Sequence, residues 1–392
     1  MSSLETPIQN PGAGAAINKG EVFASFDVDQ FEVPSGRDEA WRFTPLRRLR
    51  GLHDGTAVAD GTTTVEVTPV DGITVETVGR DDERLGQAGT PTDRVAAQAY
   101  SSFTSATVIS VGTEVVVAEP VTVTVTGPGE GKTAFGHLQI RLANFASATF
   151  VIDQRGSGTY GENIEFVLGD SAKLTVVTVQ DWADDAVHLT THHLKVGRDA
   201  TIRHTSVTLG GDLVRLSGTV RYAAPGGDAE LLGLYFADAG QHFEQRLLVD
   251  HSQPNCKSNV LYKGALQGDP KSPKGDARTV WVGDVLIRAA AEGTDTYEAN
   301  RNLVLTDGAR ADSVPNLEIE TGEIAGAGHA SATGRFDDEQ LFYLRARGIP
   351  EEVARRLVVR GFFHEIISKI AVASVRERLE AAIEAELAAI GV

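Results

Sequence analysis

Short runs of alternating apolar and polar residues fill the chain from about residue 101 to residue 325, and glycine and aspartate separate them. Val121–Thr126 and Lys173–Val179 are clear examples. A period of two is typical of β-strands with one buried face, whereas a helix repeats its apolar residues every three to four positions. The pattern therefore restricts the middle of the chain to an architecture of many short strands.

A loose repeat runs through these strands. A turn, an alanine and an alternating run recur with spacings of 26, 28, 29, 48 and 32 residues, and 48 is close to two units of 24. A period in the twenties without helices predicts a solenoid of parallel strands, a β-helix, over residues 101–332. A large β-sandwich is the alternative, because the repeat is degenerate and some turns are short enough for hairpins. The alanines are Ala146, Ala172, Ala200, Ala229, Ala277 and Ala309.

The segments before the strand region have a different character. Residues 1–20 are polar and contain Pro and Gly, which predicts a disordered tail. Residues 21–100 are predicted to form a mixed, partly helical region. Within it, Pro34–Thr44 has the residues of a helix start, and Trp41 and Phe43 are available to anchor that helix by packing.

After the strand region, residues 333–392 show a helical period. One helix is predicted from Pro350, with Glu351 in its first turn, toward Ile370. A second has an apolar residue every four positions. Either packing against the end of the β-helix or a docking surface for another protein would explain these stripes. The second stripe consists of Val375, Leu379, Ile383 and Leu387.

Charge and composition exclude several partners. The chain has 392 residues and a formal net charge of -18, so it lacks the Lys/Arg excess that neutralises phosphates, and nucleic acid and anionic membranes are poor partners. No stretch has the eighteen or more apolar residues of a membrane span, and the first twenty residues lack the apolar segment of a signal peptide. We therefore expect a cytoplasmic protein.

The cysteine and histidine content gives weak site candidates. Cys256 is the only cysteine, so neither an intrachain disulfide nor a Cys-rich metal cage can form. A lone cysteine is usually a small buried side chain, and His251 is the nearest candidate base. Four histidines lie within seventeen residues, but two are adjacent and would point to opposite faces of a strand. We interpret them as solvated strand positions: His188, His192, His193 and His204.

The segment Thr126–Thr133 nearly spells a phosphate-binding P-loop. Thr126 replaces the first required glycine, and Gly127 is one position out of register. A P-loop also needs a helix that begins at the Lys-Thr pair, whereas Phe135–Leu142 alternates like a strand. We interpret the segment as a Gly-rich turn, so no nucleotide site is predicted.

A change from strand to helix near residue 329 carries the strongest site candidate. Glu318 and Glu320 alternate with apolar residues as in a strand, glycines then surround His329, and Asp337 with Gln340 predicts a helix N-cap. A neutral imidazole nitrogen is a competent iron ligand. A lone histidine is nevertheless more often structural or solvated.

Motifs in this region resemble the SufD group of the SufB/SufD family, whose members belong to the SufB-SufC-SufD iron-sulfur cluster assembly complex. They are the Pro-x-Leu-Glu-Ile strand at 315–319, the His-x-x-x-Thr-Gly segment at 329–334, Leu-Phe-Tyr-Leu-Arg-x-Arg-Gly-Ile at 341–349, and Gly361-Phe362. A weaker similarity covers Glu39–Thr44. The resemblance extends over most of residues 37–390.

This resemblance implies a right-handed parallel β-helix flanked by N-terminal and C-terminal helical regions. It implies a non-catalytic scaffold that pairs with a SufB-like subunit and docks a SufC-like ATPase through the C-terminal helical region. His329 would share a transient iron-sulfur cluster with a cysteine of the partner, and the isolated chain would bind none. Relatives often carry a cysteine two residues before this histidine, but this chain has Ala327, so His329 would contribute alone.

Three other readings stay open at this point. A SufB-like paralogue has the same fold, although it is usually longer and richer in cysteine. A β-helix polysaccharide-active enzyme also shares the solenoid, but such enzymes generally act outside the cell, with acidic clusters and calcium or an Arg/Lys base. A purely structural homodimer without metal chemistry is the third.

Overall fold

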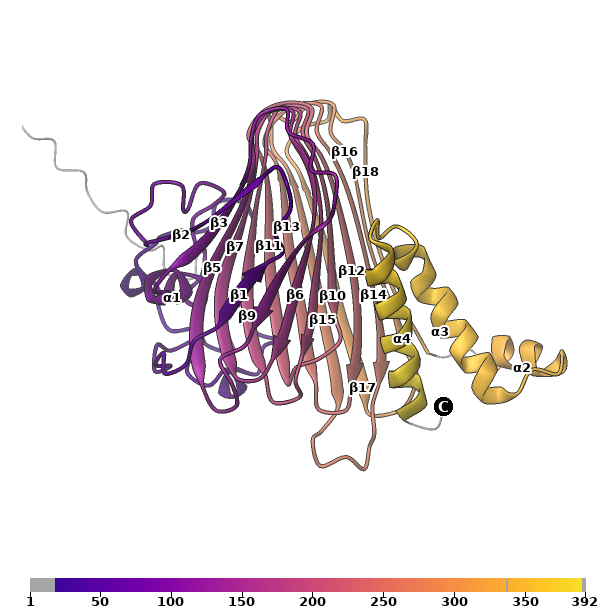
Figure 1. Ribbon diagram of the computed structural model, residues 1–392. Helices are drawn as coiled ribbons and strands as arrows, with labels where there is room; N and C mark the ends of the chain where they lie inside the picture. Colours follow the sequence, from indigo (N-terminus) through magenta and orange to yellow (C-terminus); the bar gives the residue numbers. More distant parts are fainter. Residues whose placement is uncertain (1–17, 336–337, 390–392) are drawn as a thin grey trace, which may run out of the picture.

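Two nine-stranded sheets face each other and form a solenoid through most of the molecule (Figure 1). The computed structural model describes residues 18–335 and 338–389. From β3 onward, successive strands alternate between the sheets. Eight strands of each sheet pair in parallel, with one antiparallel strand at the N-terminal edge. The predicted parallel β-helix is confirmed. A sandwich built from hairpins would instead pair consecutive strands antiparallel.

The strands of the two sheets and the helices have the following bounds. Sheet A consists of β1 (Thr64–Val67), β4 (Val121–Thr126), β6 (Ser147–Gly156), β8 (Lys173–Trp182), β10 (Thr201–Thr208), β12 (Asp228–Asp238), β14 (Lys257–Gln267), β16 (Asp295–Val304) and β18 (Gly326–Arg335). Sheet B consists of β2 (Ile73–Val78), β3 (Ala106–Val111), β5 (Thr133–Leu142), β7 (Thr159–Leu168), β9 (Val187–Val196), β11 (Leu213–Tyr222), β13 (His242–His251), β15 (Ala277–Ile287) and β17 (Ala309–Ile319). The α-helices are α1 (Arg94–Ser102), α2 (Asp338–Ala346), α3 (Glu351–Ile367) and α4 (Ala373–Ala389).

Alternation along each strand fills the space between the sheets. In β4, Val121, Val123 and Val125 are buried, and the threonines between them are partly exposed. Inward-facing residues of both sheets form one cluster that continues along the solenoid to Ala291. Burying one large apolar side chain contributes about 1.5–3 kcal/mol. Each rung completes the burial of the one before it, so the stack acts as one core.

The turns from sheet B to sheet A share one backbone conformation, which we call the turn ladder. One residue has a positive φ of 52–62°, and a small buried residue follows it. The N–H of the positive-φ residue donates to a carbonyl of the next rung, as from Ser171 N to Arg198 O at 2.7 Å. This left-handed conformation costs a non-glycine residue about 1–2 kcal/mol. The hydrogen bonds between rungs help to offset that cost. The pairs are Phe145 and Ala146, Ser171 and Ala172, Asp199 and Ala200, and Asn255 and Cys256.

The observed repeat differs in part from the predicted one. The first three predicted alanines do occupy the turn ladder, but Ala229 lies inside β12, and Ala277 and Ala309 begin strands of sheet B. The interval of 48 residues therefore crosses between sheets and does not contain two units of 24. Between the starts of successive sheet A strands from β6 onward, the rungs are 26, 28, 27, 29, 38 and 31 residues long. Each rung contributes one strand to each sheet.

The N-terminal region packs on the outer face of sheet B. The predicted helix over Pro34–Thr44 is wrong, because this segment forms turns and a short 3-10 helix (Leu46–Arg48) follows it. Two prolines bracket a segment that also contains a glycine, so a helix could not repay its nucleation cost there. Trp41 nevertheless anchors the segment, since it is buried and the Arg215 guanidinium lies 3.9 Å from its ring centre.

A buried carboxylate, Glu244, fixes this region to sheet B. It accepts a hydrogen bond from Thr44 Oγ1 at 2.7 Å and lies 3.5 Å from the Arg215 guanidinium. Burial alone would raise the pKa of Glu244, but the hydrogen bond with His242 and the charges of Arg215 and Arg246 lower it to about 2. Glu244 is therefore an ionised, fully partnered carboxylate in the protein interior.

The described chain begins against the last rung. The side chain of Asn18 donates to Glu320 at 2.7 Å, and the backbone N–H of Lys19 donates to Glu318 of β17 at 3.1 Å. Residues 1–17, where most of the predicted disordered tail falls, lie outside the described residues.

The C-terminal helices α3 and α4 lie along the outer face of sheet A (Figure 1). They do not pack against the end of the β-helix, which was one of the two explanations of their apolar stripes. The predicted stripe faces inward, and Leu379 and Ile383 are almost fully buried against residues such as Phe236. Polar contacts fix the helices, including Lys263 Nζ to the Phe362 carbonyl at 2.8 Å. Helix α2 projects away from the solenoid. No helix among the described residues is long and apolar enough to cross a membrane.

Candidate functional site at the open end

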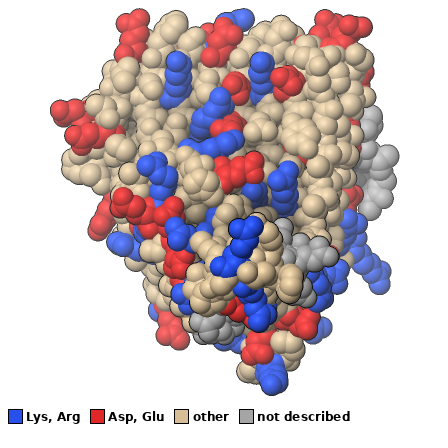
Figure 2. All heavy atoms as spheres, turned by 90° about the vertical axis from the view of Figure 1, so that its right-hand side faces the viewer, with Lys and Arg blue, Asp and Glu red and all other residues tan. Residues whose placement is uncertain are grey.

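The solenoid finishes with β17 and β18, and within the described residues no further strand pairs with either one. We call these two strands the open end. Most of β18 is exposed, and residues 326–334 are Gly, Ala, Ser, Thr and one His, without a charged side chain. Figure 2 views the molecule from this side and shows uncharged surface between scattered acidic and basic side chains. A long, uncharged strand edge with free N–H and C=O groups is suited to pairing with another chain.

His329 lies within β18, so the predicted change from strand to helix falls after Arg335 and not around His329. Residues Gly326–Arg335 form a strand of 10 residues that pairs with β16 along its length, and α2 begins only at Asp338. The glycines therefore adopt a strand conformation, because hydrogen bonds with the parallel strand β16 fix their backbone. The predicted helix N-cap at Asp337 falls outside the described residues.

The His329 side chain belongs to the inner face of sheet A. Its register partner is Glu298 of β16, and His329 Nδ1 lies 3.9 Å from Glu298 Oε1. The neighbouring Gly328 belongs to the outer face, where an added side chain would contact the ring of Tyr297. The His329 side chain remains 43% exposed, so it is accessible from the open end.

Glu298 reaches across the interior toward sheet B. Gly283 of β15 makes room for it, since a Cβ there would come within 2.4 Å of Glu298 Oε2. The side chain is 1% exposed, and Oε1 has no hydrogen-bond partner. Burial first, and then the charge of Asp284, raise the pKa of Glu298 to about 8, while the backbone N–H of Asn316 acts in the opposite direction. The carboxyl group is therefore mainly protonated at pH 7 unless a positive charge lies beside it.

An imidazole and a carboxylate are both ligands for first-row metal ions. Among the described residues, no group of three or more His, Cys, Asp or Glu side chains converges as a metal cage. Two ligands leave most of a coordination sphere empty. A cluster held at the open end would therefore need ligands from another chain, and a single ion would need water in its remaining positions.

Glu298 is not among the residues predicted from the sequence, although the sequence contains a signal for it. In the run Asp295-Thr-Tyr-Glu-Ala-Asn300, the strand period places Glu298 on the same face as Thr296 and Asn300, and all three are buried. A glutamate on the inward face of a strand is unusual, because burying a carboxylate is costly. That conflict between period and polarity marks a functional candidate.

The P-loop-like segment is a turn between β4 and β5, as predicted. Lys132 forms an ion pair with Asp60 at 3.2 Å, and Thr133 begins a strand and not a helix. Within residues 18–335 and 338–389, no helix begins at this turn, as phosphate binding would require.

The four clustered histidines are buried, so their assignment as solvated positions is wrong. His188 accepts from Trp182 Nε1 at 3.1 Å and lies 3.0 Å from Glu162, and His192 lies 3.0 Å from His204. Burial lowers the pKa of His193 and of His204 to about 4, which keeps both imidazoles neutral. They are packing and hydrogen-bonding residues within the solenoid and its coat.

Cys256 occupies the small-residue position of the turn ladder and is fully buried. Burial raises the pKa of its thiol, which disfavours the reactive thiolate. His251 bonds to Ser258 at 2.9 Å, so its Nε2 is engaged away from Cys256. The interpretation as a buried structural residue is confirmed.

A second exposed feature lies on the C-terminal helices. Phe342 and Tyr343 of α2 and Val353 and Leu357 of α3 expose between 45% and 73% of their surface. We call these four residues the apolar arm. Figure 2 shows basic side chains around the helices that project toward the viewer. The stripe of α4 that the sequence offered for docking is buried, so the exposed apolar surface is on other residues.

Comparison with known proteins agrees with this structure. Residues 123–362 match the family model described as the SUF system FeS cluster assembly, SufBD core domain. An iron-sulfur cluster assembly SufBD family protein of Mycobacterium bovis is 71% identical over 374 residues, which cover 95% of this chain and 94% of the relative. A family protein of Mycobacterium leprae is 69% identical over 372 residues, 95% of each chain. One from Synechocystis is 29% identical over 236 residues, 60% of this chain and 50% of the relative.

Fold and site together define a parallel β-solenoid whose unpaired end, and not an internal cleft, presents the candidate ligands. The comparisons make this assignment specific. The chain belongs to the SufBD family of iron-sulfur cluster assembly proteins.

Proposed function

We propose that this chain is the SufD-like, non-catalytic scaffold subunit of a cytoplasmic iron-sulfur cluster assembly complex. The observation that carries the proposal is the unpaired, uncharged edge of β18 with His329 on its inner face. A SufB-like subunit would add its own strands to this edge, which places His329 beside the partner's ligands. A transient iron-sulfur cluster would then form between the subunits, with thiolates supplied by the partner.

The sequence relationships support two different family members in one complex. Mycobacterium leprae has, besides the 69% identical relative, a second family protein that is 26% identical over 207 residues, 53% of this chain and 23% of that protein.

The alternative that the present chain is a SufB-like paralogue is less favoured. The chain has one cysteine, which is buried in a turn, so it offers no thiolate at the open end. A homodimer through the same edge is the alternative to a free open end in the isolated chain.

The reaction that this site could support is ligand exchange and not bond cleavage. Without a partner, the imidazole of His329 and the carboxyl of Glu298 are the metal-binding groups placed together at the open end. A polysaccharide-active enzyme would need an acid, a base and a sugar-binding cleft along the solenoid. The acidic side chains that lie between its sheets, Glu162 and Glu298, are both buried.

The decisive experiment is anaerobic co-expression of the chain with a SufB-like protein and a SufC-like ATPase. The purified complex should show iron-sulfur absorption. In His329→Ala the three proteins should still co-purify, because an exposed side chain is removed, but the cluster content should fall several-fold. Wild-type cluster content in that variant complex would contradict the role of His329.

We further propose that the apolar arm docks the SufC-like ATPase. Exposed aromatic and aliphatic side chains on a projecting helix pair are typical of an interaction site. Phe342→Asp together with Leu357→Asp should remove the ATPase from the complex but retain the SufB-like subunit. The matched control is Val58→Asp, at an exposed apolar residue of the N-terminal region. Unchanged ATPase recovery in the double variant would contradict this docking site.

A further inference from the structure

Glu298 has a feature that pairing of the subunits does not explain. Its side chain is almost completely buried, yet Oε1 has no hydrogen-bond partner and faces His329. An unsatisfied buried polar atom costs about 1–3 kcal/mol, and more if charged. A glutamine or a leucine would fill the same space without a charge, so the packing of the solenoid does not require a carboxylate here.

Three neighbouring strands hold this carboxyl group in place. Gly283 of β15 leaves the space that Oε2 occupies, the Asn316 backbone N–H of β17 stabilises the ionised form, and β18 brings His329 to the remaining oxygen. The missing component is a positive charge between Oε1 and His329 Nδ1. Asp284 adds negative potential to the same region, which favours a cation further.

We propose that Glu298 and His329 together bind one ferrous ion at the open end of the isolated chain, with Glu298 as the second protein ligand. Metal–nitrogen and metal–oxygen bonds of about 2.0–2.2 Å put two ligands of one ion roughly 3.0–3.5 Å apart. The observed 3.9 Å between the two atoms is slightly larger. The exposed imidazole can close the difference by a small rotation, whereas Glu298 is fixed by its surroundings.

Carboxylate with imidazole selects first-row divalent ions such as Fe²⁺ over the softer copper(I), which prefers thiolate and thioether ligands. The remaining coordination positions face the open end and would hold water. This inference rests on the proposed function, because iron bound there is cargo for cluster assembly. It adds a step in which the chain carries iron before the partner's thiolates arrive.

The chain contains a matched control pair. His53 Nε2 lies 3.9 Å from Asp54 Oδ2, the same separation as in the proposed site. Asp54 is already used, however, since its Oδ1 accepts hydrogen bonds from the backbone N–H and the hydroxyl of Thr56 at 3.0 and 2.7 Å. Proximity of a histidine and a carboxylate is therefore equal in the two pairs, and only the Glu298 pair has a buried oxygen without a partner.

The test measures binding of Fe²⁺ to the isolated full chain by anaerobic equilibrium dialysis, with Co²⁺ absorption as a second readout. The wild type should bind one equivalent. Glu298→Gln and His329→Ala should each weaken binding at least tenfold, and the double variant should be no weaker than the singles, because both ligands serve one ion. Asp54→Asn should bind like the wild type. Melting curves establish that each variant is folded.

Wild-type affinity in Glu298→Gln would overturn the inference, as would equal weakening in Asp54→Asn. These outcomes are separate from the test of the proposed function, which measures cluster content in the three-protein complex. Loss of Fe²⁺ binding with normal cluster content in His329→Ala would support the iron site and reject the role of His329 in cluster assembly. Normal Fe²⁺ binding in both ligand variants, with reduced cluster content in the complex, would reject the iron site and support the role of His329 in cluster assembly.

Discussion

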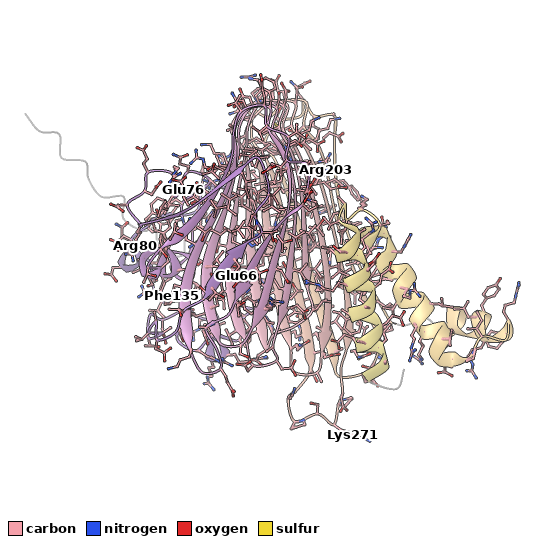
Figure 3. The ribbon with its side chains drawn as sticks, viewed as in Figure 1. Glu66, Glu76, Arg80, Phe135, Arg203 and Lys271 are labelled. Carbon is pink, nitrogen blue, oxygen red and sulfur yellow. The ribbon has the colours of Figure 1, made fainter. Side chains whose placement is uncertain are left out.

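The two ends of the solenoid treat their strand edges in opposite ways. At the N-terminal end, β1 and β2 pair antiparallel with the first rung, have 4 and 6 residues, and carry the charged side chains Glu66 and Glu76 (Figure 3). At the C-terminal end, β17 and β18 have 11 and 10 residues, and β18 has no charge before Arg335. Short, charged, reversed strands are a known protection against unwanted pairing. The edge strand β18 lacks this protection, unlike the charged β17 beside it, so sheet A has an edge that is suited to pairing at this end.

Carboxylates show the same contrast within the molecule. Glu244, beneath the N-terminal coat, is held by a hydroxyl, an imidazole and two guanidinium groups. Glu298, at the open end, keeps an oxygen without a partner. Glu244 has all its partners within the fold, whereas Glu298 has an oxygen that is available to a ligand. Four experiments test this difference between regions.

The largest effect is expected from removal of all residues after Arg335. The helices α3 and α4 cover the outer apolar face of sheet A, including Val207, Leu234 and Phe236. Without them this face becomes an exposed patch that promotes aggregation. The truncated chain should be insoluble or should melt roughly 10 °C or more below the full chain. A soluble fragment with an unchanged melting curve would show that the helices are only a docking device.

A large effect on assembly, without loss of fold, is expected from charge on β18. Ala330→Lys with Ala332→Lys would place two charges on the open edge, where lysine prevents strand addition. Pairing with a SufB-like subunit should weaken at least tenfold in pull-down titrations. Val65→Lys in β1 provides the control at the closed end, and it should leave pairing unchanged. Equal pairing by the β18 variant would remove the functional distinction between the two ends.

A moderate effect on stability is expected from Glu244→Gln. Because the folded pKa of Glu244 is about 2, below its ordinary 4.5, its contribution is present above about pH 4.5 and is lost as pH falls toward 2. The shift corresponds to about 3 kcal/mol. The variant should unfold more easily in urea at pH 7, and the difference from wild type should shrink below pH 4.5. Glu66→Gln, at the exposed closed end, should change nothing, and a pH-independent difference would contradict the assignment.

The smallest effect is expected from Lys132→Ala. This lysine pairs with an exposed aspartate in a turn between strands, and water screens such a pair, so the stability of the protein should hardly change. Neither the wild type nor the variant should bind ATP in a fluorescent-nucleotide titration. Micromolar binding that the substitution abolishes would place a nucleotide site near the closed end.

Period-two alternation was sufficient to predict the strands, because inward and outward positions differ in polarity along every strand. Their parallel stacking did not follow from it, since a β-sandwich fits the same alternation, and the family resemblance was needed to favour the β-helix. The alanine repeat did not give the boundaries of the rungs correctly. Some of the alanines lie in turns before sheet A strands, and others begin strands of sheet B. The glycines around His329 favoured a change from strand to helix there, but the strand continues to Arg335. The hydrogen bonds with β16 hold the glycine-rich segment as a strand despite its weak strand propensity. The periodicity of the sequence does not reveal this pairing.

The helical regions show the opposite balance. The stripe of α4 was predicted residue by residue, but the surface that it covers was not, because an amphipathic pattern does not identify its partner. Pro34–Thr44 has good helix-start residues and still forms turns, since packing of Trp41 against Arg215 outweighs propensity. Glu298 could be found only by asking which polar residues fall on the inward face.

The turn ladder has a mechanical consequence. Each positive-φ residue is tied by its N–H to the following rung, so a pull on the C-terminus loads these bonds one after another and not all together. When a single molecule is stretched from its C-terminus, the rungs should unfold one at a time, and the chain should lengthen in discrete steps. The step for the rung of 29 residues between the starts of β12 and β14 would be roughly 100 Å of contour. The wider rung that begins with β14 would give the tallest step.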